Sequence, residues 1–104
     1  MESKKKAETF IGFAVRTKRF KIGLNAVATL KKAYIVIVCK TASENTKKEG
    51  KKFALKFGCP LYITEERTLE ELTFKENAKI MAITDKGISK AIAENCETVL
   101  VEEN

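Results

Sequence analysis

The sequence predicts an α/β protein, a single three-layer α/β/α sandwich with a small mixed central sheet. Ala33–Cys39 is an unbroken apolar run rich in β-branched residues, which is typical of a strand covered on both faces. Helix-like and strand-like segments alternate along the chain, and this order indicates a sheet with helices on both sides. The strands are short, which favours a mixed sheet over a fully parallel one. With 104 residues and no linker or repeat, we expect one domain over residues 1–104, frayed at 1–4.

Three elements are expected before the buried strand. Residues 5–18 form the first helix, because their apolar residues recur at the spacing of one helical face. Residues 20–22 form a short strand, because Phe-Lys-Ile alternates apolar and polar side chains. Gly23 breaks this strand, and residues 24–32 again have helical spacing.

A third helix is expected after the buried strand. Thr41 and Glu44 have the spacing of a capping box, which makes Thr41 the expected N-cap. The helical pattern then runs to about Phe57, and Gly58 is the expected C-cap. The lysines between positions 47 and 56 are interpreted mainly as a solvated outer face of this helix.

The second half of the chain continues the alternation. Thr68 and Glu71 form a second capping box, and Asp85 can cap the last helix. Residues 75–77 are expected to be a loop. The further expected elements are strands at 61–63, 79–84 and 98–101 and helices at 68–74 and 86–95.

The charge is unevenly distributed along the chain. The net charge is +6; residues 1–58 carry 15 Lys and Arg against 4 Asp and Glu, whereas residues 59–104 carry 5 against 10. A basic first half attracts polyanions. No apolar run approaches the roughly 20 residues of a membrane span, and no apolar segment follows the basic start. We therefore expect a cytoplasmic protein without a membrane segment.

The residue types present argue against most enzyme chemistry. The chain has no histidine, and its three cysteines, Cys39, Cys59 and Cys96, include no CxxC pair, so a zinc site and a histidine-assisted nucleophile are not expected. All three are interpreted as reduced thiols. No glycine-rich nucleotide motif occurs. The sequence therefore predicts a protein that is not an enzyme and needs no cofactor or metal, although catalysis by carboxylates alone stays open.

The most informative stretch is residues 16–32. Four cations, Arg16, Lys18, Arg19 and Lys21, lead into Gly23-Leu24-Asn25, which has the pattern of a helix start. The first N–H groups of a helix have no partner within the helix and bind anions. The Asn25 amide can both donate and accept. This combination favours contact with a phosphate backbone, although such a cluster can also be a solvated helix end and Asn25 a local cap.

Several short motifs recur in a specific order over residues 8–93. They are Gly12–Lys18, Gly23-x-Asn25, the strand at 34–38, Ala42–Lys48, Cys59–Leu61, Glu70–Leu72 and Asp85–Ile88. In this order and spacing they resemble the kink-turn RNA-binding superfamily of large-subunit ribosomal proteins, of the archaeal seven-Ae and eukaryotic thirty-e type, and in particular its small bacterial members. The resemblance implies a noncatalytic, ribosome-associated protein that binds a kinked or otherwise structured RNA, with ribosomal RNA as its partner and contacts to ribosomal proteins.

The resemblance also implies where RNA would bind. In the family, the Gly-x-Asn helix start meets the sheared G·A pairs of the kink, and the loop before the fourth strand packs on a flipped-out nucleotide; Gly23, Asn25 and residues 75–78 match these elements. Lys31 is expected close to the site because it ends the helix that Asn25 opens. The full set of expected RNA-binding residues is Arg16, Lys18, Arg19, Lys21, Gly23, Leu24, Asn25, Lys31, Lys40, Lys75, Asn77 and Lys79.

Some positions depart from the family pattern. Ala26 stands where strong binders have Glu, Thr29 where they have Lys, and Lys40 where an acidic residue is common. Ala26 and Thr29 support a second hypothesis, a protein-interaction module that has lost kink-turn specificity and presents its acidic second half to a basic partner.

Phe13 and Phe20 are expected in the core rather than as stacking platforms.

Overall fold

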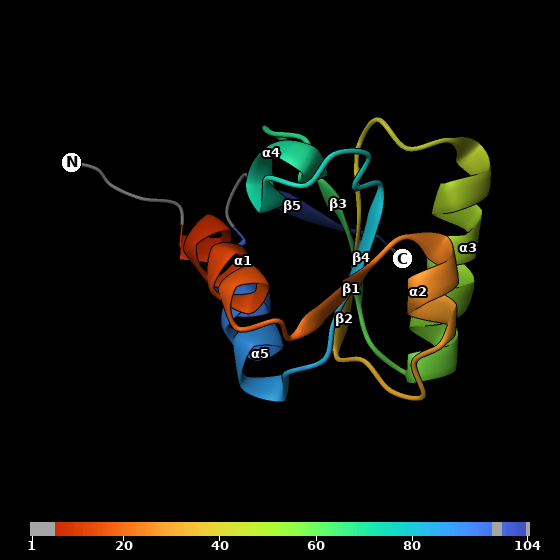
Figure 1. Cartoon of the computed structure of the whole chain (residues 1–104), viewed down its shortest axis with the longest axis horizontal. Coiled ribbons are helices and arrows are strands. Elements are labelled where there is room, and N and C mark those ends of the chain that lie inside the picture. Colours follow the sequence, from red (N-terminus) through yellow and green to blue (C-terminus); the bar gives the residue numbers. More distant parts are fainter. Residues whose placement is uncertain (1–5, 97–98, 104) are drawn as a thin grey trace.

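Helices and strands alternate over the part of the chain that the computed structural model describes, residues 6–96 and 99–103 (Figure 1). The elements are α1 (Lys6–Arg16), β1 (Phe20–Ile22), α2 (Leu24–Ala28), β2 (Ile35–Val38), α3 (Glu44–Phe57), β3 (Leu61–Thr64), α4 (Leu69–Thr73), β4 (Ile80–Ile83), α5 (Lys86–Glu94) and β5 (Leu100–Glu103). This alternation is the order that the sequence predicts.

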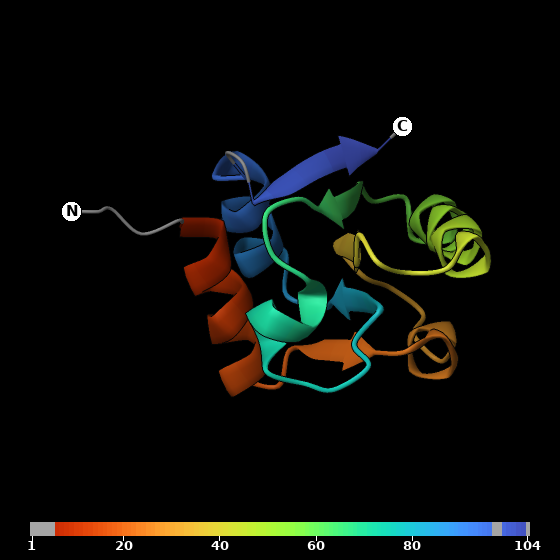
Figure 2. The same ribbon diagram turned by 90° about the horizontal axis from the view of Figure 1, so that it is seen from above.

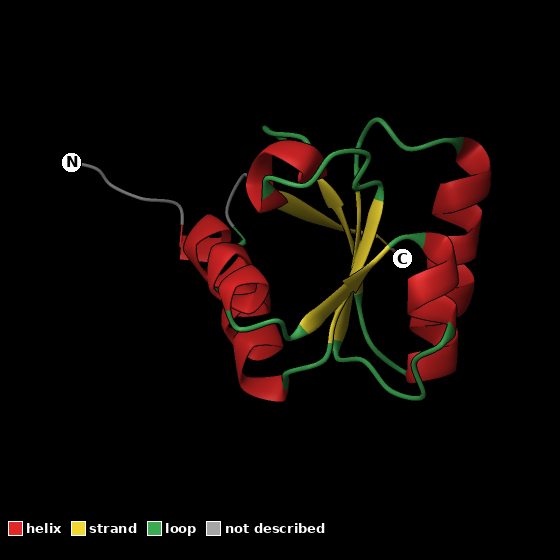
Figure 3. Ribbon diagram, in the orientation of Figure 1, coloured by secondary structure: helices red, strands yellow, loops and turns green. Residues whose placement is uncertain are grey.

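The five strands form one mixed sheet in the order β1-β4-β2-β3-β5. Only β2 and β3 are parallel; the other three neighbouring pairs are antiparallel. Helices α2 and α3 cover one face of the sheet, and α1, α4 and α5 cover the other (Figures 2 and 3). The expected three-layer α/β/α sandwich with a mixed sheet is confirmed.

The strand directions create two distinct sheet edges. Strands β1, β2 and β3 run one way, and β4 and β5 run the other. We call the end of the sheet where β1, β2 and β3 finish and β4 begins the upper edge; it is at the top in Figure 1, and the term refers to the ends of the strands and not to an edge strand. There Gly23 N–H donates to the Ile80 carbonyl (3.0 Å) and Cys39 N–H donates to the Lys79 carbonyl (2.8 Å). At the opposite, lower edge, Thr84 N–H donates to the Arg19 carbonyl (3.0 Å).

The core lies on both faces of the central strands. All four residues of β2 and all four of β4 are buried. Apolar side chains of the flanking helices complete it, among them Ile11 of α1, Phe57 of α3 and Ile92 of α5. Such double-sided burial explains why the sequence of β2 is a continuous apolar run rather than an alternating one. Among the described residues, no helix is long and apolar enough to cross a membrane.

Local capping signals set most helix ends as expected. Thr68 and Glu71 make both hydrogen bonds of a capping box. Asp85 caps α5, since its Oδ1 accepts from the Ile88 N–H (2.8 Å). Gly58 ends α3 in the left-handed conformation (φ 66°), which glycine adopts without strain.

The expected N-cap of α3 is wrong. Ser43, not Thr41, caps the helix, and its Oγ accepts from the Thr46 N–H (3.1 Å). The Thr41 hydroxyl is instead bound by other partners: it lies 3.1 Å from the sulfur of Cys39, two residues earlier, and accepts from Lys79 Nζ (3.0 Å).

Some expected boundaries are also wrong. Helix α2 ends at Ala28, because the Thr29 hydroxyl donates to the Ala26 carbonyl (2.6 Å) and the helix is not continued to residue 32. Helix α1 ends at Arg16, and Lys18 has a left-handed backbone (φ 61°). Strand β5 is Leu100–Glu103 rather than 98–101, and the expectations for residues 1–4 and 98 lie outside the described residues. The buried position expected for Phe13 is wrong as well, since that residue is 43% exposed.

Candidate nucleic-acid interface

Three segments far apart in the sequence meet in a shallow depression of about 540 Å³ at the upper edge of the sheet, which we call the upper depression. They are the start of α2, the first turn of α3 and the loop between α4 and β4. Its lining residues are Ile22, Gly23, Leu24, Asn25, Ala26, Thr46, Asn77, Lys79 and Ile80. Gly23, Leu24, Asn25, Asn77 and Lys79 are five of the residues expected to contact RNA, so the fold brings this part of the expected set together.

The N-cap residue of α2 provides no side-chain acceptor for the first N–H groups of the helix. Gly23 is the N-cap, has φ 100° and ψ 147°, and supplies no side-chain hydrogen bond to the helix. A positive φ of this size favours glycine, so the sequence turns sharply from β1 into α2 here. Asn25 follows in the first turn; its residue is exposed, and its side chain has no hydrogen-bond partner among the described residues. The alternative role of Asn25 as a local cap is therefore not what the geometry shows.

The loop before β4 is held by one carboxylate. Glu70 accepts from the Asn77 N–H (3.0 Å) and from Lys79 Nζ (3.1 Å). Asn77 itself has φ 58°, a left-handed conformation that Asn tolerates better than most residues. Glu70 thus fixes the loop beside α2, and it also offsets the charge of the lysine that lines the upper depression.

Three other expected lysines lie apart from the upper depression. Lys40 is at the same edge, but its Nζ donates to the Glu65 carbonyl (3.0 Å). The Nζ of Lys75 lies 5.9 Å from the centroid of the Phe20 ring. Lys21 is exposed in the middle of edge strand β1, opposite Ala82 in the register.

The remaining expected residues are at the lower edge. Arg16, Lys18 and Arg19 precede β1, and Arg19 pairs with Asp85 (3.5 Å). Four residue steps along a strand separate Arg19 from Gly23, or roughly 13 Å. Lys31 follows the end of α2, where the neighbouring Lys32 Nζ donates to the carbonyl of Phe57 (2.8 Å) at the end of α3. The cations expected around Asn25 are therefore spread along the sheet: Lys40 and Lys79 lie at the upper edge, Lys21 lies midway along β1, and Arg16, Lys18, Arg19 and Lys31 lie at the lower edge.

One polar residue that lines the upper depression was not among the residues expected to contact RNA. Thr46 lies in the first turn of α3, and its hydroxyl is 3.1 Å from the Ser43 hydroxyl. It belongs to the Ala42–Lys48 motif, so the sequence contained the signal. Its neighbourhood with Gly23 depends on α2 and α3 packing side by side on one face, which residue spacing does not reveal (Figure 1).

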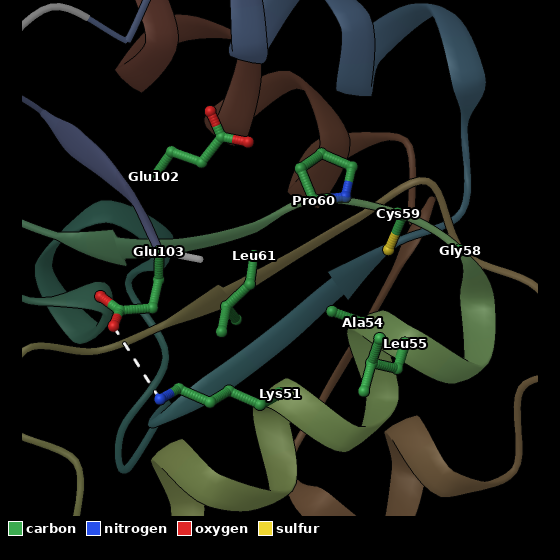
Figure 4. Close-up of a pocket in the computed structure, with 9 residues that line it drawn as sticks. All are labelled: Lys51, Ala54, Leu55, Gly58, Cys59, Pro60, Leu61, Glu102 and Glu103. Carbon is green, nitrogen blue, oxygen red and sulfur yellow. Dashed lines mark ion pairs between the residues drawn. The ribbon is translucent and has the colours of Figure 1, made fainter.

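A second groove of about 440 Å³ lies between α3 and β5 (Figure 4). Lys51 and Glu103 pair across it at 3.9 Å, and the Cys59 side chain is at one end. Burial raises the pKa of the Cys59 thiol to about 11, partly opposed by Lys32, so this thiol is protonated at neutral pH. A protonated thiol is a poor nucleophile.

The Cys39 thiol has the opposite tendency. Burial raises its pKa, but hydrogen bonds from the Thr41 side chain and the Leu69 N–H, together with the charge of Lys79, outweigh burial and lower it below the ordinary value. The side chain is nevertheless fully buried, as its place at the end of the apolar run predicts. Among the described residues, no group of three or more Cys, Asp or Glu side chains is arranged to hold a metal ion.

Comparison with known proteins bears on the fold. No family model matches this chain, and no curated protein matches it. Among solved structures it is similar to one described as a protein with unknown function from Bacillus halodurans C, with a TM-score of 0.75 and 21% sequence identity over 90% of this chain and 99% of that chain. A likeness at this identity concerns the fold alone.

Proposed function

We propose that this protein binds structured RNA at the upper depression without catalysing a reaction, and that its target is a kinked or otherwise irregular element, most simply of ribosomal RNA. The observation that carries the proposal is the meeting of Gly23-Leu24-Asn25 with Asn77 and Lys79 in one depression. These residues come from two segments that the resemblance to kink-turn binders had separately assigned to RNA contact.

The chemistry of the upper depression suits RNA whose base edges are accessible. The exposed Asn25 amide, which has no hydrogen-bond partner in the described part of the chain, can donate to and accept from a base edge in a distorted element. Gly23 has no side chain, so a nucleotide can approach the backbone closely. A regular A-form duplex would offer mainly phosphates and sugar hydroxyls to such a surface. The proposed preference for irregular RNA follows from this difference.

The alternative function is a protein-interaction module. It is favoured by one observation: Glu70 pairs with Lys79 at 3.1 Å, which reduces the positive charge at the upper depression. Together with Ala26 and Thr29 in place of charged side chains, this leaves fewer groups to hold phosphates than a strong kink-turn binder has. A basic protein segment would then be the partner.

The two functions are separated by binding assays on the purified chain. Fluorescence anisotropy compares a kink-turn RNA with a straight duplex of equal length at 50 and 200 mM salt. We expect tighter binding to the kinked RNA at both concentrations, and Asn25→Ala to weaken that binding about tenfold, as for loss of one base-edge contact.

The matched control is Asn45→Ala. Asn45 occupies in α3 the position that Asn25 occupies in α2, second after the N-cap, and it does not line the upper depression. Equal affinity for both RNAs, or equal effects of the two substitutions, would reject the proposed site. Partners that stay bound to the endogenous protein after nuclease treatment would favour the interaction module.

A further inference from the structure

A mostly apolar groove of about 380 Å³ lies between α1 and α5, which we call the lower groove. Phe10 and Phe13 line it from α1, and Gly87, Ile88 and Ala91 line it from α5. It lies at the lower edge of the sheet, because α1 leads into the start of β1 and β4 leads into α5. It is therefore separate from the upper depression.

An exposed aromatic ring forms one wall of the lower groove. Phe13 is 43% exposed, and the guanidinium carbon of Arg16 lies 5.8 Å from the centroid of its ring. A ring beside a guanidinium is a surface on which nucleic-acid bases stack. Opposite, Gly87 leaves bare backbone, and a methyl group placed there would approach only the Asp85 carboxylate, at 3.4 Å. The groove can thus admit a flat group beside Phe13.

Positive charge surrounds the lower groove. Arg19 lines it, Arg16 and Lys18 stand before β1, and Lys86 and Lys90 each directly precede a groove residue of α5. The one acidic lining residue is Asp85, whose carboxylate already accepts from the Ile88 N–H and pairs with Arg19. Arg19 uses one of its five N–H groups for this pair at 3.5 Å, and its side chain is 59% exposed, so it can donate to an anion.

We propose that the lower groove binds an unpaired nucleotide, with its base against the Phe13 ring and its phosphate near Arg16 and Arg19. A nucleotide fits better than a partner helix, because Phe13 is the one large exposed apolar residue among those lining the groove, whereas cations surround it. The inference extends the proposed function to a second RNA contact of a different kind, single-stranded rather than kinked. Either contact can fail without the other.

The absence of tryptophan from the sequence provides a direct test. Phe13→Trp places a single tryptophan on the groove, and Leu55→Trp places one at an 84% exposed position on α3, on the other side of the sheet; excitation at a wavelength that tyrosine does not absorb reports on the tryptophan alone. Each variant is titrated with a single-stranded uridine octamer and with an abasic octamer of the same charge. We expect saturable quenching of Trp at position 13 by the uridine octamer only, because the base must stack. Equal quenching by the abasic strand, or at position 55, would overturn the proposal.

The unlabelled chain gives a second readout. Phe13→Ala should weaken binding of the uridine octamer about tenfold, within the range for loss of one stacked base, while Leu55→Ala, at an exposed position on the other side of the sheet, leaves it unchanged. Because Phe13 is also partly buried, its removal could disturb the fold, and the fold of the variant is checked by circular dichroism. If Phe13→Ala is folded and binds the octamer as tightly as the parent chain, no base stacks there and the groove is a protein-docking surface or a bare one. Loss of kinked-RNA binding in Asn25→Ala concerns the upper depression and would not count as support for nucleotide binding in the lower groove.

Discussion

Helix α3 approaches the sheet closely at Gly50, and this contact makes a sharp prediction. Gly50 lies inside α3 and is buried. A Cβ atom at this position would lie 2.7 Å from Val38 Cγ2, 3.5 Å from Leu61 Cδ1 and 3.6 Å from Ile80 Cδ1. Val38 is fully buried in β2, and its β-branched side chain has little rotamer freedom, so the clashing methyl group cannot easily move. Gly50→Ala therefore forces α3 away from the sheet.

The expected change in the free energy of unfolding of Gly50→Ala is the sum of two opposing contributions. Alanine is about 1 kcal/mol more favourable than glycine inside a helix, whereas overpacking a well-packed core costs about 1–3 kcal/mol. Gly50→Ala should thus lower the free energy of unfolding by about 0–2 kcal/mol. Gly12→Ala, in α1 with no atom within 4 Å of the added methyl group, keeps only the favourable term. The difference in the free energy of unfolding between the two variants, about 1–3 kcal/mol, measures the steric cost of the methyl group at position 50.

Urea unfolding followed by circular dichroism at 222 nm measures both variants. The midpoint should rise for Gly12→Ala and stay level or fall for Gly50→Ala, with unchanged slopes. Repeating Gly50→Ala in a Val38→Ala background removes the clashing atom, so there the second substitution should be neutral or stabilising. If Gly50→Ala stabilises the parent chain as much as Gly12→Ala does, the reasoning about this contact is refuted.

Two further predictions concern strain and pH. Phe74 ends α4 with φ 59° and is 88% exposed. Because glycine adopts this left-handed conformation without strain, Phe74→Gly should raise the free energy of unfolding by about 1 kcal/mol. A lower urea midpoint would show that the ring makes contacts that outweigh the strain. Burial raises the pKa of Cys59 from 9.0 to about 11, so the unfolded thiol releases its proton first as the pH rises. The free energy of unfolding, measured under reducing conditions, should therefore fall between pH 9 and 11, and less steeply in Cys59→Ala; identical slopes would contradict this.

The sequence reveals the fold wherever the signal is local. The apolar run of β2, the capping box at Thr68 and the cap at Asp85 each involve residues within a few positions, and each is correct. The error at Thr41 has a partly tertiary cause, because its hydroxyl is held by Lys79, 38 residues away, and by nearby Cys39 and is not available to cap α3. A capping motif predicts a helix start only when its hydroxyl has no competing partner.

The candidate site was less predictable because it depends on strand direction. Arg19 and Gly23 are four positions apart, and proximity in sequence suggested a single patch. An extended strand between them places the Arg19 side chain and the Gly23 backbone at opposite edges of the sheet. Conversely, Thr46 and Asn77 are distant in sequence from Gly23 but line the same depression. Spacing along the chain predicts neighbours on a helix, whereas across a sheet the neighbours follow from topology.

The two candidate RNA surfaces are joined by one strand, and this arrangement restricts how they could act together. β1 is an edge strand, with β4 on one side and no strand paired on the other among the described residues. An RNA that contacted both surfaces would have to run along β1 for roughly 13 Å, given the strand rise. Lys21 is exposed midway along that path. A kinked element in the upper depression and an unpaired nucleotide in the lower groove therefore fit one RNA only if a short single-stranded segment follows the kink.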